Sequence, residues 1–195
     1  MNIKKYAAIL IFLLSILILS NGIYAAENYT EEPTQQEIQN NEENIEQTYV
    51  KTSKELSDAL EQINESTIKK HEINLKQNNY NLISTFKGDI SSETEKEIVI
   101  NGNNSIINGK NQRPFLTTSK KIKLIINNLS IVNMQDNYGP AIKNYGTIIL
   151  NNVSFENNNA NQYPIGGGVI FTDGSTYINN CTFKNKCDKQ FSFPL

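Results

Sequence analysis

The stretch IILNNVSF, residues 148–155, decides the fold, because two related stretches flank it. The preceding one is LIINNLSI at 124–131, and the following one is TYINNCTF at 176–183. The first Asn of the pair stands at positions 127, 151 and 179. Repeats of roughly 20 to 50 residues are typical of solenoid proteins, in which each unit stacks on its neighbours. The sequence therefore predicts a solenoid.

Apolar residues alternate twice within each repeat. Leu124 and Ile126 lie two positions apart, as do Leu129 and Ile131, whereas three positions separate Ile126 from Leu129. A period of two indicates a strand with one buried face. The longer step requires the chain to turn a corner before the next apolar side chain points inward. Two short strands joined at a corner describe one coil of a parallel β-helix.

The Asn pair lies at this corner in all three repeats. Asn tolerates left-handed backbone better than other non-glycine residues, and its side chain bonds nearby backbone. Coils stacked about 4.8 Å apart would align these amides into a ladder. We expect equivalent corners at Asn127, Asn151 and Asn179, with Ile126, Leu150 and Ile178 stacked inside.

Two further elements share the period. GPAI at 139–142 and GGVI at 167–170 are offset by the same distance as Asn151 and Asn179, and NYG at 144–146 and TDG at 172–174 follow them. Glycine before a small or β-branched apolar pair predicts a turn that leads into a third strand. The four extra residues of the second unit predict a loop at Asn157–Pro164. Two weaker coils precede these repeats, one with Ile73, Leu75, Tyr80 and Leu82 and the other with Ile98, Ile100, Ile106 and Ile107.

The pattern predicts an all-β chain, a right-handed parallel β-helix of about four to five coils with a short N-terminal capping helix. The alternative is a set of antiparallel hairpins in a sandwich. Hairpins give no reason for one Asn pair to return at the same corner, so the β-helix is the better prediction.

The ends of the chain predict four segments. Residues 1–26 combine a basic start, a short apolar run and small residues, which is typical of a secretory signal peptide, and an uncleaved membrane anchor is the alternative. Residues 27–50 carry many Glu and few apolar side chains, which predicts an acidic disordered spacer rather than an acidic binding tail. The β-helix domain follows at 51–187. An irregular tail occupies 188–195, and we expect the chain to be a fragment of a longer protein rather than a small complete domain.

A capping helix is predicted near 53–64. Thr52 and Glu55 form a capping-box pattern, and Leu56, Leu60 and Ile63 mark one apolar face. Such a helix would cover the open end of the first coil, where exposed strand edges favour aggregation.

The two cysteines indicate no disulfide framework. Cys181 occupies an inward position equivalent to Leu129 and Val153, which predicts a buried small side chain. Pairing with Cys187, a little further along the chain, is the alternative for an exported protein.

The sequence predicts no catalytic, cofactor-binding or metal-binding residues. Acidic residues in the coils do not recur at the repeat spacing, so we expect no stacked carboxylates for acid/base or metal chemistry; they are Asp89, Glu93, Glu95, Glu97, Asp136, Glu156, Asp173 and Asp188. His71, the one histidine, is predicted to be solvated, and Arg113 is the one arginine. The formal net charge is −2 with no basic patch in the sequence, which disfavours nucleic acid and anionic membranes as partners. We also expect no membrane insertion after signal removal.

N-glycosylation sequons are frequent. Three of them coincide with the corner residues Asn128, Asn152 and Asn180, where a structural role explains the Asn. Asn28 and Asn64 lie outside the repeats and are the better acceptor candidates.

The segment from about Val50 to Lys186 resembles the pectin-lyase-like parallel β-helix of adhesin-like surface proteins of methanogenic archaea, including the Asn/Thr-rich large proteins. The motifs FENN at 155–158 and GGVI at 167–170 also resemble polymorphic outer-membrane protein repeats. The resemblance implies secretion, display at the cell surface and an adhesive role.

Three functional hypotheses follow. The first is a secreted or cell-surface, non-catalytic adhesin-like β-helix that binds cell-surface glycans or a host or neighbouring cell. The second is a polysaccharide lyase or glycoside hydrolase on the same fold, disfavoured by the scattered acids. The third is a structural envelope component without a specific ligand.

Overall fold

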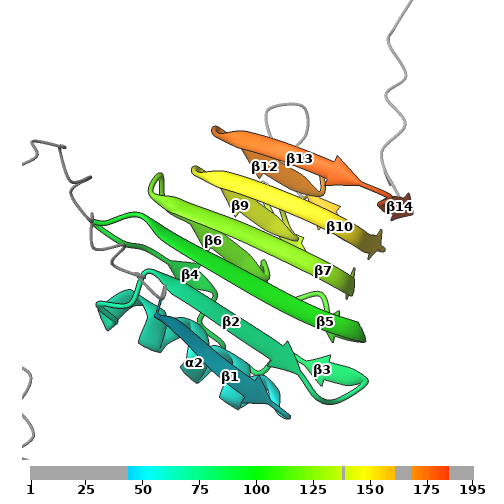
Figure 1. Ribbon diagram of the computed structural model, residues 1–195. Helices are drawn as coiled ribbons and strands as arrows, with labels where there is room; N and C mark the ends of the chain where they lie inside the picture. The colour runs from blue at the N-terminus through cyan, green and yellow to red at the C-terminus, as the bar shows by residue number, and fades with distance from the viewer. Residues whose placement is uncertain (1–43, 138, 161–167, 185–195) are drawn as a thin grey trace, which may run out of the picture. The chain divides into compact units, whose positions relative to one another are not determined.

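The computed structural model describes residues 44–137, 139–160 and 168–184. In this part of the chain, parallel strands stack into a β-solenoid of about five turns with one helix (Figure 1). The predicted all-β parallel β-helix is therefore confirmed. The predicted signal peptide, the tail and most of the acidic spacer lie outside the described residues.

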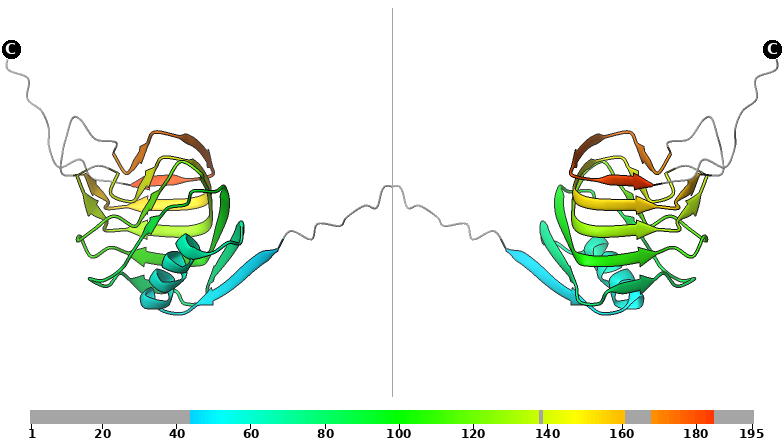
Figure 2. Two further views of the ribbon diagram at one scale, coloured as in Figure 1. Left: turned by 90° about the vertical axis from the view of Figure 1, so that its left-hand side faces the viewer. Right: turned by 90° about the vertical axis from the view of Figure 1, so that its right-hand side faces the viewer.

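One long sheet runs through all the turns. Its main path is β1 (Ile45–Val50), β2 (Lys70–Leu75), β5 (Lys96–Asn108), β7 (Ile122–Val132), β10 (Thr147–Glu156) and β13 (Ser175–Asn179), with β3 (Asn79–Asn81) beside β5 and β14 (Thr182–Lys184) beside β10. All these pairs are parallel. Figure 2 shows the strands stacked as successive turns, from β1 at one end to β13 and β14 at the other.

Two shorter sheets complete the turns. The first contains β4 (Asp89–Ile90), β6 (Leu116–Thr118), β9 (Ile142–Asn144) and β12 (Ile170–Thr172), and the second contains β8 (Gln135–Asp136) and β11 (Asn159–Ala160). Ile170 pairs with Ile142, so the third strand lies where the sequence predicts it.

The register of the long sheet confirms the predicted corners. Asn151 pairs with Asn127 on one side and with Asn179 on the other. Leu150 pairs with Ile126 and Ile178 in the same way, which places the three aliphatic side chains in one stack. Ile126 and Leu150 are fully buried, whereas Ile178 is 50 % exposed because no described turn lies beyond it.

The strands bend at the second Asn of each pair. Asn128, Asn152 and Asn180 have φ angles of 51°, 54° and 50°, in the left-handed region. In the described part of the chain, eight of the nine non-glycine residues with positive φ are Asn. β7 and β10 are single strands that continue through this bend, where the sequence predicts two short strands, because pairing resumes directly after the left-handed residue.

The corner of β5 is longer than the others. The left-handed residues Asn103 and Asn104 shift the register between Asn101 and Ser105. Ser105 is consequently buried and donates to Gln77 O at 2.6 Å, whereas Ile106 points outward and is 37 % exposed. The other apolar residues predicted for the two weaker coils are buried.

A polar side chain organises the corner before β10. Asn144 is fully buried; its Nδ2 donates to Thr172 Oγ1 at 3.1 Å, and its Oδ1 accepts from Thr118 Oγ1 at 3.0 Å. The backbone of neighbouring turns comes so close here that a Cβ on Gly146 would lie 2.2 Å from Ile122 O. A larger residue at Gly146 would push the turns apart.

The helix α2 (Ser53–Glu65) covers the first turn as expected. Thr52 Oγ1 accepts from Glu55 N at 3.1 Å, which confirms the predicted N-cap. The second bond of the expected capping box differs, because the Glu55 carboxylate accepts from Lys51 N at 2.7 Å, one residue before the N-cap. The predicted apolar face of Leu56, Leu60 and Ile63 is buried in the core.

Two predictions at this end are wrong. Residues 45–50, assigned to the disordered spacer, form the strand β1 that pairs in parallel with β2 and precedes the helix. His71 is buried rather than solvated: its Nδ1 lies 3.1 Å from Glu46 Oε2 and its Nε2 lies 2.9 Å from Ile68 O. Both errors have one cause, because β1 supplies the carboxylate that makes burial of His71 favourable.

The first residues of the predicted Asn157–Pro164 loop belong to the solenoid. Asn158 is buried, its Oδ1 accepts from Met134 N at 2.9 Å, and Asn159–Ala160 forms β11 on β8. The chain therefore remains part of the solenoid to Ala160, and residues 161–167 lie outside the described part.

The substitution Leu150→Asp tests the inside/outside assignment. Its carboxylate would lie unpaired in a fully buried stack, so we expect a loss of about 4 kcal/mol or more in the free energy of unfolding. Ser154→Asp, on the outward face of the same strand, should cost about 1 kcal/mol or less. Urea unfolding followed by circular dichroism measures both, and equal losses would contradict the assignment.

Candidate functional site

The outer face of the long sheet repeats the same kinds of side chain in parallel columns. One column consists of Asn74, Asn101, Asn127, Asn151 and Asn179. The neighbouring outward column consists of Glu72, Val99, Ile125, Ile149 and Tyr177, and the next consists of Lys70, Glu97, Lys123, Thr147 and Ser175. The solenoid therefore presents three stripes. One consists of amides, the second is mainly apolar, and the third is charged in the first three turns and uncharged at Thr147 and Ser175.

The column of amides forms the expected ladder. Each Nδ2 donates to the Oδ1 of the preceding turn, at 3.1 Å from Asn101 to Asn74, 3.0 Å from Asn127 to Asn101, 2.8 Å from Asn151 to Asn127 and 2.8 Å from Asn179 to Asn151. A second ladder links Asn128, Asn152 and Asn180. These hydrogen bonds give the Asn residues a structural role, including at the three sequons in the repeats.

Asn64, the sequon residue predicted to be a better acceptor, also has a structural role. Its Nδ2 donates to Asp89 O at 3.0 Å, and its Oδ1 accepts from Ser91 N at 2.9 Å. A glycan on this nitrogen would compete with the first of these bonds. Asn28 lies outside the described residues.

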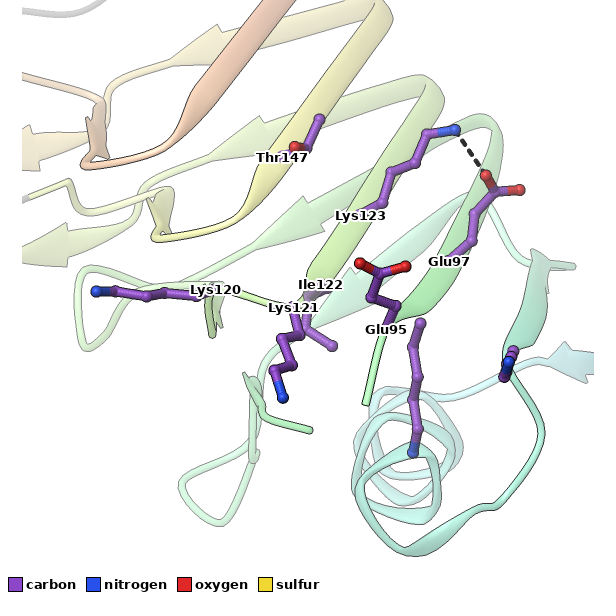
Figure 3. Close-up of a pocket in the computed structure, with 9 residues that line it drawn as sticks. Glu95, Glu97, Lys120, Lys121, Ile122, Lys123 and Thr147 are labelled. Atoms are coloured by element: carbon purple, nitrogen blue, oxygen red, sulfur yellow. Dashed lines mark hydrogen bonds and ion pairs between the residues drawn. The ribbon is translucent and has the colours of Figure 1, made fainter. Parts of the chain in front are cut away.

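An open cavity of about 390 Å³ lies at the edge of the long sheet, where β2, β5, β7 and β10 begin (Figure 3). Its lining contains five lysines and two glutamates: Lys69, Lys96, Lys120, Lys121, Lys123, Glu95 and Glu97. We call this set the lysine corner. The sequence predicts no basic patch, but the solenoid brings lysines from three successive turns to one edge.

Lys96 is the buried member of the lysine corner. It is 3 % exposed, and its Nζ donates to Ser66 O at 2.7 Å and to Ile63 O. Both carbonyls lie at the C-terminal end of α2, where a positive charge is favourable. Burial lowers the pKa of the Lys96 amine. Lys96 therefore fixes the capping helix to β5 and is not available to a ligand.

Glu97 lies between two lysines of neighbouring strands. Its Oε2 is 2.7 Å from Lys123 Nζ and its Oε1 is 3.3 Å from Lys70 Nζ. The hydrogen bond from Lys123 and the weaker one from Lys70 lower the pKa of the Glu97 carboxyl. Figure 3 shows Lys123 and Glu97 pointing toward one another. This carboxylate is therefore held ionised between cations.

The remaining lysines of the corner face solvent. Lys69, Lys120 and Lys121 are exposed. Lys121 Nζ donates to Glu93 O, and among the described residues neither Lys69 nor Lys120 has an ion-pair partner. These side chains, rather than Lys96, are accessible to a ligand.

The acids outside the lysine corner lie at separate positions of the turn. Asp136 forms an ion pair with Lys143, and Glu156 and Asp173 occupy other positions of the turn. Within residues 44–137, 139–160 and 168–184, no group of His, Cys, Asp and Glu side chains could hold a metal ion. Three acids lie closer together. Glu95 and Glu97 line the lysine corner, and the backbone oxygen of Glu93 accepts a hydrogen bond from Lys121 beside it.

Arg113 stabilises a loop. Its Nη1 donates to Phe86 O at 2.7 Å, and its Nη2 donates to Ser84 O. Cys181 is half-buried against the core, with its Sγ 3.6 Å from Leu150 O. Cys187, the other cysteine, lies outside the described residues.

The substitution Lys96→Met tests the attachment of the helix. It keeps the apolar stem but leaves two carbonyls near the helix end without their donor, so we expect a loss of about 1–3 kcal/mol in the free energy of unfolding. Lys110→Met, at an exposed position, should change it by about 0.5 kcal/mol or less. Thermal unfolding compares the two, and similar small effects would contradict the assigned role.

The Glu97 ion pairs predict a dependence of stability on pH. The pKa of Glu97 is lower in the folded chain than its ordinary value of 4.5, so their contribution is present above that value and is lost as the pH falls through the lowered pKa. A double-mutant cycle with Glu97→Gln and Lys123→Gln should give a coupling of about 0.5–1 kcal/mol near neutral pH, which decreases as the pH falls through the lowered pKa of Glu97. A coupling that does not change with pH would contradict this assignment.

Comparison with known proteins gives no relative. No protein-family model, no curated protein and no solved structure matches the chain significantly. Among the described residues, no helix has the length and apolar character needed to span a membrane. The repeated outer face and the lysine corner are therefore the features that bear on function.

Proposed function

We propose that this chain is a non-catalytic, adhesin-like β-helix that is secreted or displayed at a cell surface, where it binds glycans or a neighbouring surface. The observation that carries the proposal is the repetition of the outer face. Amides, aliphatic side chains and charged side chains each recur at one position over successive turns. A repeated array suits a repeated ligand such as a polysaccharide, whereas a catalyst requires a unique constellation of groups.

The proposed location rests on the N-terminal sequence. A basic start, a short apolar run and the small residues near Ala25 and Ala26 favour export. The many Asn residues of the outer face are compatible with a role in contact with solvent and polar polymers.

A lyase or hydrolase is the second candidate, because the lysine corner places Glu95 near several lysines. Its groups are poorly arranged for that chemistry. Lys96 is bound to the end of α2, and Glu97 is bound between Lys70 and Lys123. A general base must be able to reach the proton that it removes. This arrangement favours binding over cleavage.

The proposal predicts that the purified chain from Glu27 to Leu195 is retained weakly on polysaccharides or cell surfaces and releases no sugar ends. Retention on immobilised glycans and on whole cells, and assays for reducing and unsaturated ends, measure the two properties. Sugar release that Glu95→Gln and Lys121→Gln abolish would establish an enzyme instead. Arg113→Ala tests the one arginine in the same assays, with circular dichroism to detect loss of the loop. Absence of retention on every surface would favour a structural envelope component.

A further inference from the structure

We infer that the lysine corner is a binding site for an anionic glycan, which it recognises through the carboxylate or sulfate groups of the sugar chain. This inference rests on the proposed function and names the ligand class and the site. It depends on the cavity, on the side chains that face it and on the way successive turns are stacked.

The shape of the site suits a chain-like ligand. The cavity of about 390 Å³ is open to solvent and is lined by residues of four turns, from Lys69 before β2 to Thr147 at the start of β10. Parallel strands lie about 4.8 Å apart. This distance is comparable with the length of one sugar residue. Each sugar of a glycan that crosses the strands would therefore contact one turn of the solenoid.

The charge of the site favours anions, although the whole chain has a formal net charge of −2. Glu97 is neutralised by Lys70 and Lys123, which leaves Glu95 as the one lining carboxylate without a described ion pair. Lys69, Lys120 and Lys121 also line the cavity and are exposed. The accessible charge is therefore positive, and it is concentrated at one corner.

The accessible lysines also have little other structural role. Lys96 carries the structural role at this corner through its bonds to Ser66 O and Ile63 O. Figure 3 shows Lys120 and Lys121 extending away from the Glu97–Lys123 pair, from the loop that leads into β7. The Lys120 ammonium group, which has no ion-pair partner among the described residues, is therefore able to contact a ligand without loss of the fold. Lys121 Nζ would exchange a single bond, to Glu93 O, for such a contact.

The experiment measures binding of the purified chain to three glycans. Polygalacturonate carries carboxylates, heparin carries both sulfates and carboxylates, and dextran carries no charge. We expect binding to one or both anionic glycans to exceed binding to dextran and to weaken as salt is added. The double variant Lys69→Gln/Lys120→Gln should bind about tenfold more weakly. The two anionic arms show which acid group the site prefers.

The matched control is Lys51→Gln/Lys110→Gln, which removes the same charge from exposed positions elsewhere. It should bind within about twofold of the unmodified chain. Equal losses in both double variants would overturn the inference, since they would indicate attraction to overall charge. Retention on dextran or cells without any preference for anionic glycans would overturn the site but not the proposed function. Absence of retention on all surfaces would overturn both.

Discussion

The left-handed bend at Asn128, Asn152 and Asn180 is the constraint on which the rest of the solenoid depends. Each bend lies between two inward-facing stretches, and it lets both point their aliphatic side chains into one core. If one turn bent a residue earlier, every side chain after it would change face, because side chains alternate along a strand. The amide ladders hold successive bends in the same place and so preserve the common register.

Much of the fold follows from local sequence. The alternation of Ile and Leu, broken once by the Asn pair, predicts both the burial of Ile126 and Leu150 and their pairing. The helix is equally predictable, because Thr52 and Glu55 act on backbone groups within a single helical turn. Such features depend on side chains that are close in sequence, or on a repeat that makes distant turns equivalent.

The features that sequence reasoning missed depend on contacts between different turns. His71 is buried because Glu46 faces it from β1, and the sequence around Glu46 is too polar to indicate a strand. The lysine corner joins residues from Lys69 to Lys123, and no local motif links them. Lys96 binds carbonyls of a helix that precedes it by one full turn of the solenoid. The concentration of positive charge at one edge could be found only after the register of β2, β5 and β7 was known.

The amide ladder has a direction. Every Nδ2 from Asn101 to Asn179 donates toward the turn before it, and Asn74 Nδ2 lies 3.3 Å from Glu72 Oε1 at the start of the series. Aligned amides polarise one another, so each added turn meets a stronger acceptor than an isolated amide offers. Within the described turns the last amide oxygen of the series is Asn179 Oδ1. The stack is therefore polar along the solenoid axis, and each turn offers the next an acceptor whose position favours one orientation and one register.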